Sequence, residues 1–310
     1  MEFALIIPTW NAAPHWHALE EGIRRQSVLP DKVIIIDSSS TDDTVARAKN
    51  AGFLVVEIPH DEFTHGGSRQ TAALCAPTAD LLIYLTQDAV PLGTEAFRHI
   101  VSAFRDHAIG AAFGRQLPRP GASVIEAHAR LFNYPPVSQL RSWHSRAQLG
   151  FKSIFFSNTF GAYRRQALMS IGGFSPEADF GEDTLAVAHL HLAGWKTAYV
   201  AEALVQHSHS YSIGAEFRRY IQVGTLHRRE RWLVEQFGAV GGEGWRFVVS
   251  ELRYVSKHAP LQLPAALLRT AMRYVAYQVG LRRSPDLTRP RQQLNKSLPV
   301  PGRTPEKFWN

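Results

Sequence analysis

Four short apolar runs near the N-terminus most constrain how this chain folds. They read FALIIP (3–8), KVIIID (32–37), FLVVEI (53–58) and LLIYLT (81–86), and helical periodicity follows each of them. The helical stretches lie at roughly 15–26, 42–50, 68–76 and 94–106. Strands that are apolar on both faces and alternate with helices are typical of a parallel sheet covered on both sides. The sequence therefore predicts an α/β fold.

The loops that follow these strands are where a ligand is expected. In open α/β sheets, ligands bind beyond the carboxyl ends of the strands. The four loops read PTWNAA, DSSSTDDT, PHDEFTHGGSR and TQDAVP, and each is dense in polar and turn residues. We therefore expect the functional residues to gather at this edge of the sheet.

Asp88 ends one of these strands, in the sequence LTQDAVP. One explanation is a turn, and the other is a divalent metal ion, since hard cations prefer carboxylate oxygens. His207 and His209 are two residues apart in an extended stretch and share one face. A lone histidine is usually a packing residue, but two beside a carboxylate favour a metal site. Because the other strand-end loops converge on the same edge, we interpret Asp88 as a metal ligand.

Asp37 and the HGGSRQ stretch (65–70) suggest a nucleotide site. Asp37 stands too early to cap the next helix, and a carboxylate there can accept a hydrogen bond from the imide of uracil or thymine. The glycines before a Ser68 cap allow a close backbone approach, and Arg69 could reach a phosphate or a base. A plain loop-to-helix junction is the more common explanation of this stretch.

The rest of the chain gives less regular patterns. The segments 113–123 and 132–143 are expected to be loops around a helix, and 155–165 a strand that enters a helix. Glu182 and Asp183 open a helix over 181–194, where two acids also favour the positive end of the helix dipole. Residues 196–211 predict a pair of strands, and 215–237 one long helix.

Composition indicates the cellular compartment and the class of protein. The chain has 310 residues, of which 45% are hydrophobic and 20% charged, as in globular proteins with a core. Its one cysteine, Cys75, permits no internal disulfide and favours a reducing compartment such as the cytoplasm. The N-terminus lacks the pattern of a signal peptide, and no uninterrupted apolar stretch has the length of a spanning helix.

Positive charge is concentrated in the last third of the chain. Residues 1–210 carry 17 Lys and Arg against 20 Asp and Glu, a net −3, whereas residues 211–310 carry 17 against 7, a net +10. Such asymmetry suggests a membrane surface, a lipid diphosphate or nucleic acid, and equally a solvated basic face. The last helix, 264–283, has Arg269 and Arg273 on one face. It is expected either to lie on a membrane or to pack against its own domain.

Taken together, the motifs resemble a known family. IIPTWN, VIIIDSSSTDDT, HGGSRQTAA, YLTQDAVP, FGEDTLAVAHLHLAGWKTAYV and HSHSYS occur in the order seen in family 2 glycosyltransferases of the GT-A fold. FTHGGSR and HSHSYS resemble in particular bacterial rhamnosyltransferases that use dTDP-rhamnose. The resemblance covers about residues 3–230. It implies a GT-A domain over 1–212, a helical and possibly membrane-associated region over 213–283, and a poorly ordered tail over 284–310.

The resemblance also implies roles for single residues. Asp183 matches the general base, Asp88 and His207 the ligands of Mg²⁺ or Mn²⁺, and Glu182, His209 and Trp195 are expected to support the base or the acceptor. Thr86 departs from the family pattern, which has an aspartate there, and this puts tight metal binding in question. The expected nucleotide and donor site comprises Pro8, Thr9, Asn11, Asp37, Ser39, Gly67, Arg69, Gln87 and Asp88.

The function that these residues imply is an inverting sugar transfer. The expected donor is dTDP-L-rhamnose, and the acceptor is a hydroxyl of a glycan or lipid-linked glycan in cell-surface polysaccharide synthesis, such as that of O-antigen. The chain is expected in the cytoplasm or at the cytoplasmic membrane face, without nucleic acid as a partner. The alternatives are a UDP-hexose donor, a catalytically weak nucleotide-sugar-binding protein and a nucleotidyltransferase, although the last usually has a Gly-rich basic loop near its N-terminus.

Overall fold

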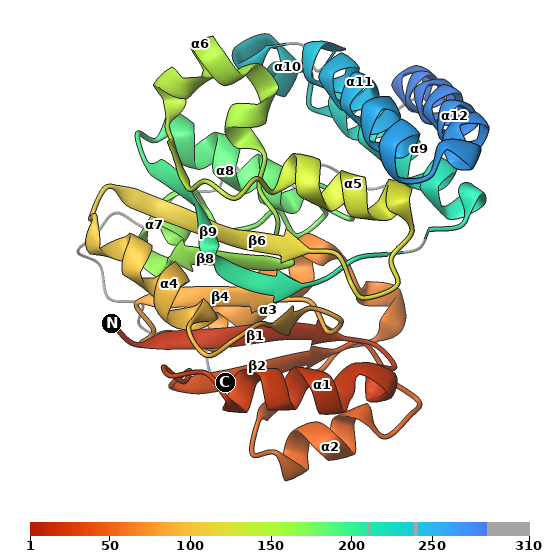
Figure 1. Ribbon diagram of the computed structural model, residues 1–310. Helices are drawn as coiled ribbons and strands as arrows, with labels where there is room; N and C mark the ends of the chain where they lie inside the picture. Colours follow the sequence, from red (N-terminus) through yellow and green to blue (C-terminus); the bar gives the residue numbers. More distant parts are fainter. Residues whose placement is uncertain (210, 239–240, 284–310) are drawn as a thin grey trace.

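A mixed β-sheet forms the centre of the molecule (Figure 1). The structure is a computed structural model that describes residues 1–209, 211–238 and 241–283. The strand order is β3-β2-β1-β4-β8-β6-β9-β5, and β7 pairs with β9. The first four strands are parallel and match the four predicted runs: β1 (Phe3–Thr9), β2 (Lys32–Asp37), β3 (Leu54–Glu57) and β4 (Leu81–Leu85).

The second half of the sheet mixes strand directions. β8 (Phe160–Arg164) runs antiparallel to both its neighbours, β4 and β6 (Ile109–Leu117). β9 (Lys196–Gln206) is parallel to β6, while the short strands β5 (Val90–Pro91) and β7 (Gln139–Arg141) are antiparallel to β9. The carboxyl ends of β1, β2, β3, β4, β6 and β9 therefore share one edge, where β8 begins. The predicted α/β fold is confirmed.

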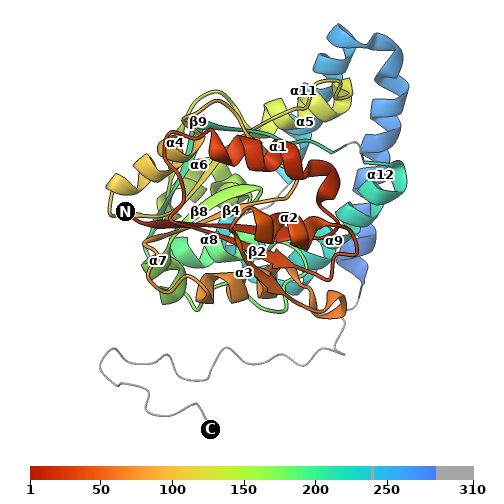
Figure 2. The same cartoon turned by 90° about the horizontal axis from the view of Figure 1, so that it is seen from below.

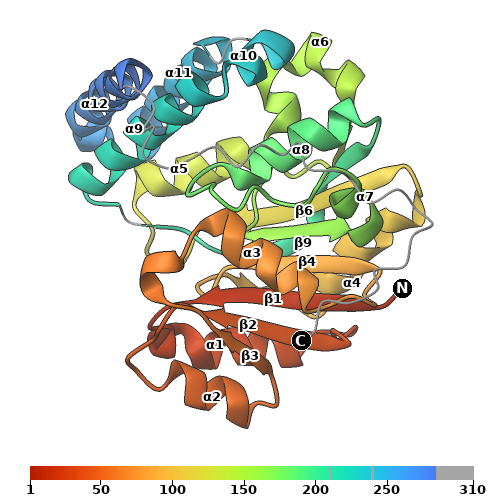
Figure 3. The same ribbon diagram turned by 180° about the vertical axis from the view of Figure 1, so that it is seen from behind.

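Helices cover both faces of the sheet (Figures 1 and 3). α1 (Ala13–Arg24), α2 (Thr44–Asn50) and α4 (Ala96–Ser102) pack on one face, and α3 (His65–Leu74), α7 (Arg165–Ser170) and α8 (Glu182–Leu192) on the other. Alternate strand residues enter the two cores, since Ile6 belongs to one and Leu5 and Ile7 to the other. This explains why the strands read as continuously apolar.

Four further helices gather beside one end of the sheet (Figures 1 and 2). They are α9 (Ile213–Arg229), α10 (Arg231–Phe237), α11 (Gly241–His258) and α12 (Leu263–Arg282). α9 and α12 approach at Gly224 and Gly280, where an added Cβ would lie 2.3 Å from the Tyr277 carbonyl oxygen and 2.2 Å from that of Ile221. Glycine is thus required at both positions of this crossing. In the described ranges, we find no helix with the length and apolar character needed to cross a bilayer.

The remaining elements are short and connect these layers. α5 (Val124–Asn133) and α6 (Arg146–Leu149) follow β6 and β7. Single-turn 3₁₀ helices occur at His60–Glu62, Ala103–Arg105, Trp143–Ser145, Gly150–Ile154 and Pro260–Gln262.

Several sequence-based predictions of elements were wrong. Residues 113–117 continue β6 rather than forming a loop, and 196–206 is one long strand because register shifts allow β9 to follow β6 throughout. The single helix expected over 215–237 breaks at Glu230, whose carboxylate accepts hydrogen bonds from Arg229 and Trp232. The predicted tail, 284–310, lies outside the described residues.

Candidate active site

Asp88 lies in a turn directly beyond β4, as the first of the two explanations of this residue predicts. The Ala89 amide donates to the Thr86 carbonyl at 3.0 Å, which closes the turn. Gln87 ties the turn to the end of β1 through two hydrogen bonds with the backbone of Trp10. The turn aims the Asp88 carboxylate at the segment that follows β9.

Asp88, His207 and His209 form a cluster that fits a divalent cation. Their ligand atoms lie within 4.8 Å of one another. Asp88 Oδ2 is 3.5 Å from Nε2 of His207 and 3.5 Å from Nδ1 of His209. One carboxylate and two imidazoles suit Mn²⁺ and related ions. His209, to which the family resemblance gives only a supporting role, therefore stands among the candidate metal ligands.

The tautomer of His207 supports this assignment. Its Nδ1 lies 2.9 Å from Oε1 of Gln116, an oxygen that also accepts from Arg130. Because an amide oxygen only accepts, Nδ1 carries the proton, and the lone pair of Nε2 is directed toward Asp88. Gln116 in turn donates from Nε2 to Ser157, which fixes its orientation.

The charges of the cluster favour a cation. Burial opposes ionisation of Asp88, but a protonated His207, which can donate to Asp88 from Nε2, and the nearby His209 outweigh it and keep the Asp88 pKa below its ordinary value. Burial lowers the pKa of His207, and it lowers that of His209 to about 4. Arg119 donates to Asp88 Oδ2 at 3.1 Å and supplies positive charge at the rim. An anionic carboxylate and neutral imidazoles are the forms that bind metals.

A second acidic pair lies at the start of α8. Glu182 is buried and accepts from Arg69 at 2.9 Å and from the side-chain Nδ2 of Asn158 at 3.0 Å. Burial disfavours its charge, but Arg69 outweighs that effect, so the pKa of Glu182 is lowered. Asp183, by contrast, forms no ion pair with a cation among the residues that the structure describes. Burial and the neighbouring Glu182 raise the pKa of Asp183 to about 7. A carboxylate poised near neutral pH is suited to general base catalysis.

Residues 157–159, here called the bridging segment, join the two clusters. The Ser157 hydroxyl accepts from Gln116, which holds the ring of His207. The Asn158 amide N–H donates to Asp183 at 3.4 Å, and its side chain reaches Glu182. The Thr159 carbonyl accepts from the Thr86 amide, two residues before Asp88. The candidate base and the candidate metal ligands thus share one edge of the sheet.

The first two strand-end loops are tied to each other at the same edge. Asp37 is fully buried and accepts from Thr9 at 2.8 Å and from the amide and hydroxyl of Ser40 at 2.7 and 2.6 Å. Asn11 accepts from the Thr41 amide at 2.8 Å. These bonds use most of the acceptor capacity of Asp37. A contact with a base would take its remaining lone pair or displace Ser40.

Two other expected donor residues occupy this region. Pro8 is the penultimate residue of β1 and pairs with Ile36. Ser39 adopts a positive φ of 61° and donates to the Ile58 carbonyl at 3.0 Å. Both residues lie at the tips of adjacent strands, as the sequence predicted.

The start of α3 differs from its prediction. Thr64 caps the helix, not Ser68, and its hydroxyl accepts from the Gly67 amide. A Cβ on Gly66 would lie 1.9 Å from the Ser175 carbonyl oxygen, so the close approach there is to the chain's own backbone. Arg69 is buried and committed to Glu182 instead of facing a free phosphate. Sequence proximity to the glycines could not show this long-range pairing.

Trp195 lies away from the site. It directly precedes β9, next to the start of β6, and packs beside Gly110. His207 follows the other end of β9, and eleven strand residues span roughly 35 Å. The expectation that Trp195 supports the acceptor is therefore not carried further.

Gln116, Arg119 and Asn158 were missed by the sequence analysis. Gln116 and Arg119 are polar residues at the end of an apolar strand, which is the signal used for the other loops. The loop predicted over 113–123 conceals this signal, because it leaves no strand end there. Asn158 precedes the antiparallel β8, so the rule for carboxyl ends does not reach it.

Comparisons with known proteins agree with this geometry. Residues 4–172 match the model of glycosyl transferase family 2. The chain is 41% identical over 281 residues to the O-antigen chain rhamnosyltransferase RfbN of Salmonella typhimurium, covering 90% of each chain. It is also 41% identical to the O-antigen chain rhamnosyltransferase WbaN of Salmonella anatum, over 90% of this chain and 89% of that protein.

Solved structures share the fold at low sequence identity. The mannosyltransferase PcManGT from Pyrobaculum calidifontis, in complex with GDP-Man and Mn²⁺, has a TM-score of 0.61 at 17% identity, covering 90% of this chain and 86% of that chain. S. aureus TarS 1–349 in complex with UDP-GlcNAc has a TM-score of 0.55 at 12% identity, covering 91% and 90%. With the family match and the two relatives, these findings confirm that the chain belongs to glycosyl transferase family 2.

Proposed function

We propose that the chain transfers L-rhamnose from dTDP-L-rhamnose to a hydroxyl of a lipid-linked glycan during O-antigen synthesis. The observation that carries the sugar and the pathway is the 41% identity, over nine-tenths of the chain, to two O-antigen chain rhamnosyltransferases. The chemistry is supported by the joined acidic and metal-type clusters at one edge of the sheet.

In the proposed reaction, Asp183 is the general base. It takes the proton of the acceptor hydroxyl as that oxygen forms a bond to the anomeric carbon, while the bond from this carbon to the diphosphate oxygen breaks. A single displacement inverts the anomeric centre and releases dTDP. Glu182 stays ionised beside Arg69 and holds the Asp183 pKa up by its charge. The base can then both accept a proton and release it near neutral pH.

We propose Asp88, His207 and His209 as ligands of a divalent cation, with Mn²⁺ as the first candidate because two ligands are imidazoles. When bound, such an ion offsets the negative charge that develops on the leaving diphosphate. Arg119, at the rim of this cluster, is positioned to add positive charge. The donor contacts proposed for Pro8, Thr9, Asn11, Asp37, Ser39, Gly67, Arg69, Gln87 and Asp88 remain predictions.

We also propose that the reaction takes place at the cytoplasmic face of the membrane, where a lipid-linked acceptor resides. The single cysteine and the basic last third of the chain support this location. Residues 1–212 would then form the catalytic unit and 213–283 the membrane-facing unit.

Calorimetric titration with dTDP and with UDP, each with and without Mn²⁺, tests the donor. We expect Mn²⁺-dependent binding that prefers dTDP and that is lost in Asp88→Ala. The matched control is Asp61→Ala, since Asp61 is an exposed acid on another loop. A preference for UDP would discard rhamnose but keep the fold and the base. No binding of either nucleotide with the metal present would favour a non-catalytic protein.

A further inference from the structure

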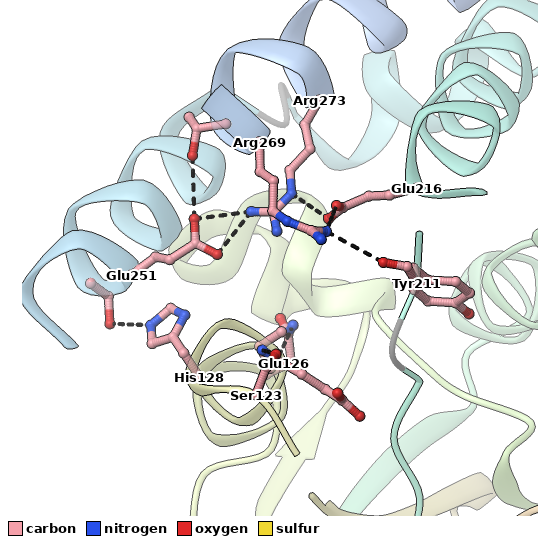
Figure 4. A network of polar contacts seen from close by, with 12 residues as sticks. Ser123, Glu126, His128, Tyr211, Glu216, Glu251, Arg269 and Arg273 are labelled. Atoms are coloured by element: carbon pink, nitrogen blue, oxygen red, sulfur yellow. Dashed lines mark hydrogen bonds and ion pairs between the residues drawn. The ribbon is translucent and has the colours of Figure 1, made fainter. Parts of the chain in front are cut away.

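Helix α12 has its charged residues inside and its apolar residues outside. The only charged residues between Leu263 and Leu281 are Arg269 and Arg273. Arg273 is buried and binds Glu216 at 2.6 Å and Glu251 at 2.9 Å, and Arg269 binds Glu216 at 2.5 Å. Figure 4 shows both arginines directed into the space between α12, α11 and α9. The face of α12 that carries the arginines therefore packs against the chain's own helices, which is one of the two alternatives that the sequence left open.

The outward face of α12 is apolar along the helix. The exposed residues of this apolar stripe follow the three- and four-residue spacing of one helix face. They include Leu267, Leu268, Tyr274 and Val275, with exposed fractions of 54%, 63%, 66% and 53%. Ala271 and Val279 complete the stripe, and Leu261, at the turn before α12, is 95% exposed. A helix with this inverted pattern needs a covering surface.

The charge around the apolar stripe indicates what covers it. Arg253 and Lys257 on α11, and Arg282 and Arg283 at the end of α12, are exposed, and none of them forms an ion pair with another described residue. Glu216, Glu243 and Glu251, the acids of α9 and α11, are each already paired with an arginine or lysine. The free charge near the stripe is therefore basic.

We propose that the apolar stripe of α12 docks on an anionic lipid surface, with the basic residues at its ends bound to lipid head groups. An apolar helix face flanked by Lys and Arg is the pattern of a helix that lies in the membrane interface. A second copy fits less well, because a two-fold interface would place basic residues against basic residues. The segment after Arg283 is also net basic, with five Lys and Arg against two acids, and offers no charge complement.

The same helix is attached to the candidate active site. Arg269 donates to the Tyr211 carbonyl at 3.5 Å, and the ring of Tyr211 packs 5.0 Å from that of His209. A docked α12 thus places the cluster of Asp88, His207 and His209 close to the lipid surface. This inference rests on the proposed function in one respect: the lipid surface is taken to be the one that carries the acceptor.

Vesicle co-sedimentation of the full chain tests the proposal. We expect binding to phosphatidylcholine vesicles that contain phosphatidylglycerol, and much weaker binding to phosphatidylcholine alone. The double variant Leu267→Ser/Leu268→Ser should bind at least about tenfold more weakly, because it removes two large apolar groups from the membrane contact. The control Leu74→Ser/Val137→Ser changes residues of similar exposure, 60% and 65%, on other surfaces and should bind like the wild type.

Two further measurements separate the outcomes. Lys257→Gln/Arg282→Gln should weaken binding at low salt and differ little from the wild type at high salt. Calorimetric titration of every variant with dTDP checks the fold and the donor site independently of lipid. The proposal is overturned if the wild type ignores anionic vesicles at low salt, or if both double serine variants lose binding equally. A dimer in light scattering that Leu267→Ser/Leu268→Ser dissociates, without any vesicle binding, would assign the stripe to a second copy instead.

Discussion

Asp183 carries a conflict between stability and activity. Its pKa of about 7 exceeds the ordinary value of 3.8, so the folded state binds a proton more tightly than the unfolded state. The stability that this proton contributes is fully present at low pH and is lost as the pH rises toward 7. Above that pH, the folded protein holds an ionised carboxylate next to Glu182. The ionised form of Asp183 that catalysis needs is therefore the form that destabilises the folded state.

The first prediction follows from this conflict. Asp183→Asn should lower the transfer rate by about 10²- to 10⁴-fold, as expected for loss of a general base. At pH 8 it should also raise the free energy of unfolding, by about 1 to 2 kcal/mol after discounting for the partial exposure of the group. The stability gain should vanish at pH 4. Thermal unfolding at both pH values and a rate assay measure the two effects.

The control for this variant is Asp61→Asn, because Asp61 is exposed and lies in the 3₁₀ helix at His60–Glu62 rather than on α8. Neither its rate nor its stability should change appreciably. A variant of Asp183 that loses activity but is destabilised at pH 8 would show that the carboxylate is held by partners rather than strained by Glu182.

The second prediction concerns the pH dependence of the wild type. Because Asp183 must be ionised to accept a proton, kcat/KM should rise with pH and level off above about pH 7. Removal of the positive charge in Arg69→Met should change the pKa of the pair and so move this midpoint. A rate that is flat from pH 5 to 9 would rule out Asp183 as the titrating base.

The third prediction tests how His207 is oriented. Gln116→Met keeps the size of the side chain but removes the oxygen that holds the Nδ1 proton. We expect the affinity for Mn²⁺ to fall by about 10- to 100-fold, as is usual when an outer partner of a metal-binding histidine is lost. Titration calorimetry with Mn²⁺ measures it, and Gln139→Met is the control because Gln139 lies on β7, away from the cluster. An unchanged affinity would remove His207 from the ligand set.

At the scale of elements, the crossing of α9 and α12 depends on two glycines. The fourth prediction is that Gly224→Ala destabilises the protein by about 1 to 3 kcal/mol, because the methyl group would collide with the backbone of α12. Gly244→Ala, in the first turn of α11 with open space around it, is the matched control. It should be neutral or stabilise by up to about 1 kcal/mol, because alanine favours helix. Chemical denaturation compares the two, and equal effects would contradict the packing argument.

The elements that the sequence predicted well are those with strong local patterns. β1, β2 and β4 are apolar on both faces, and their bounds agree with the predicted runs to within one residue. The sequence analysis missed β6 because Gly114, Arg115 and Gln116 interrupt its apolar run, although Gln116 is buried by its partners. The break at Glu230 depends on side-chain contacts that a helical pattern does not record.

At the scale of the whole molecule, a buried ion-pair network joins the C-terminal helices (Figure 4). The fifth prediction is that Arg273→Met destabilises the protein by about 3 to 5 kcal/mol, because it leaves Glu216 and Glu251 short of a shared buried cation. Arg269→Met should cost less, since Glu216 keeps Arg273 and the site is more exposed. Arg273→Lys should rescue little, because an ammonium cannot reproduce the planar, multiply bonded contact.

Unfolding in denaturant measures these three variants. Equal losses for Arg269→Met and Arg273→Met would show that burial does not govern the strength of the network.

The sequence predicts the site only in part, because contacts between distant segments depend on how the whole molecule packs. The rule that ligands bind beyond the carboxyl ends of strands predicts that Asp37, Asp88 and His207 lie at one edge, since that rule depends on topology alone. The partners that set their charge and orientation come from distant segments, as in Arg69 with Glu182 and Gln116 with His207. Such pairings depend on how helices pack on the sheet, which no local pattern specifies.

The proposed ligands have a consequence for the lifetime of the protein. Asp88 follows β4 and His207 follows β9, and these strands are separated in the sheet by β8 and β6. A cation held by both would act as a clasp across the two halves of the sheet. Because anything bound only by the folded state stabilises it by mass action, resistance to proteases would track the supply of that cation. A cell short of the metal would then lose the enzyme itself as well as its turnover.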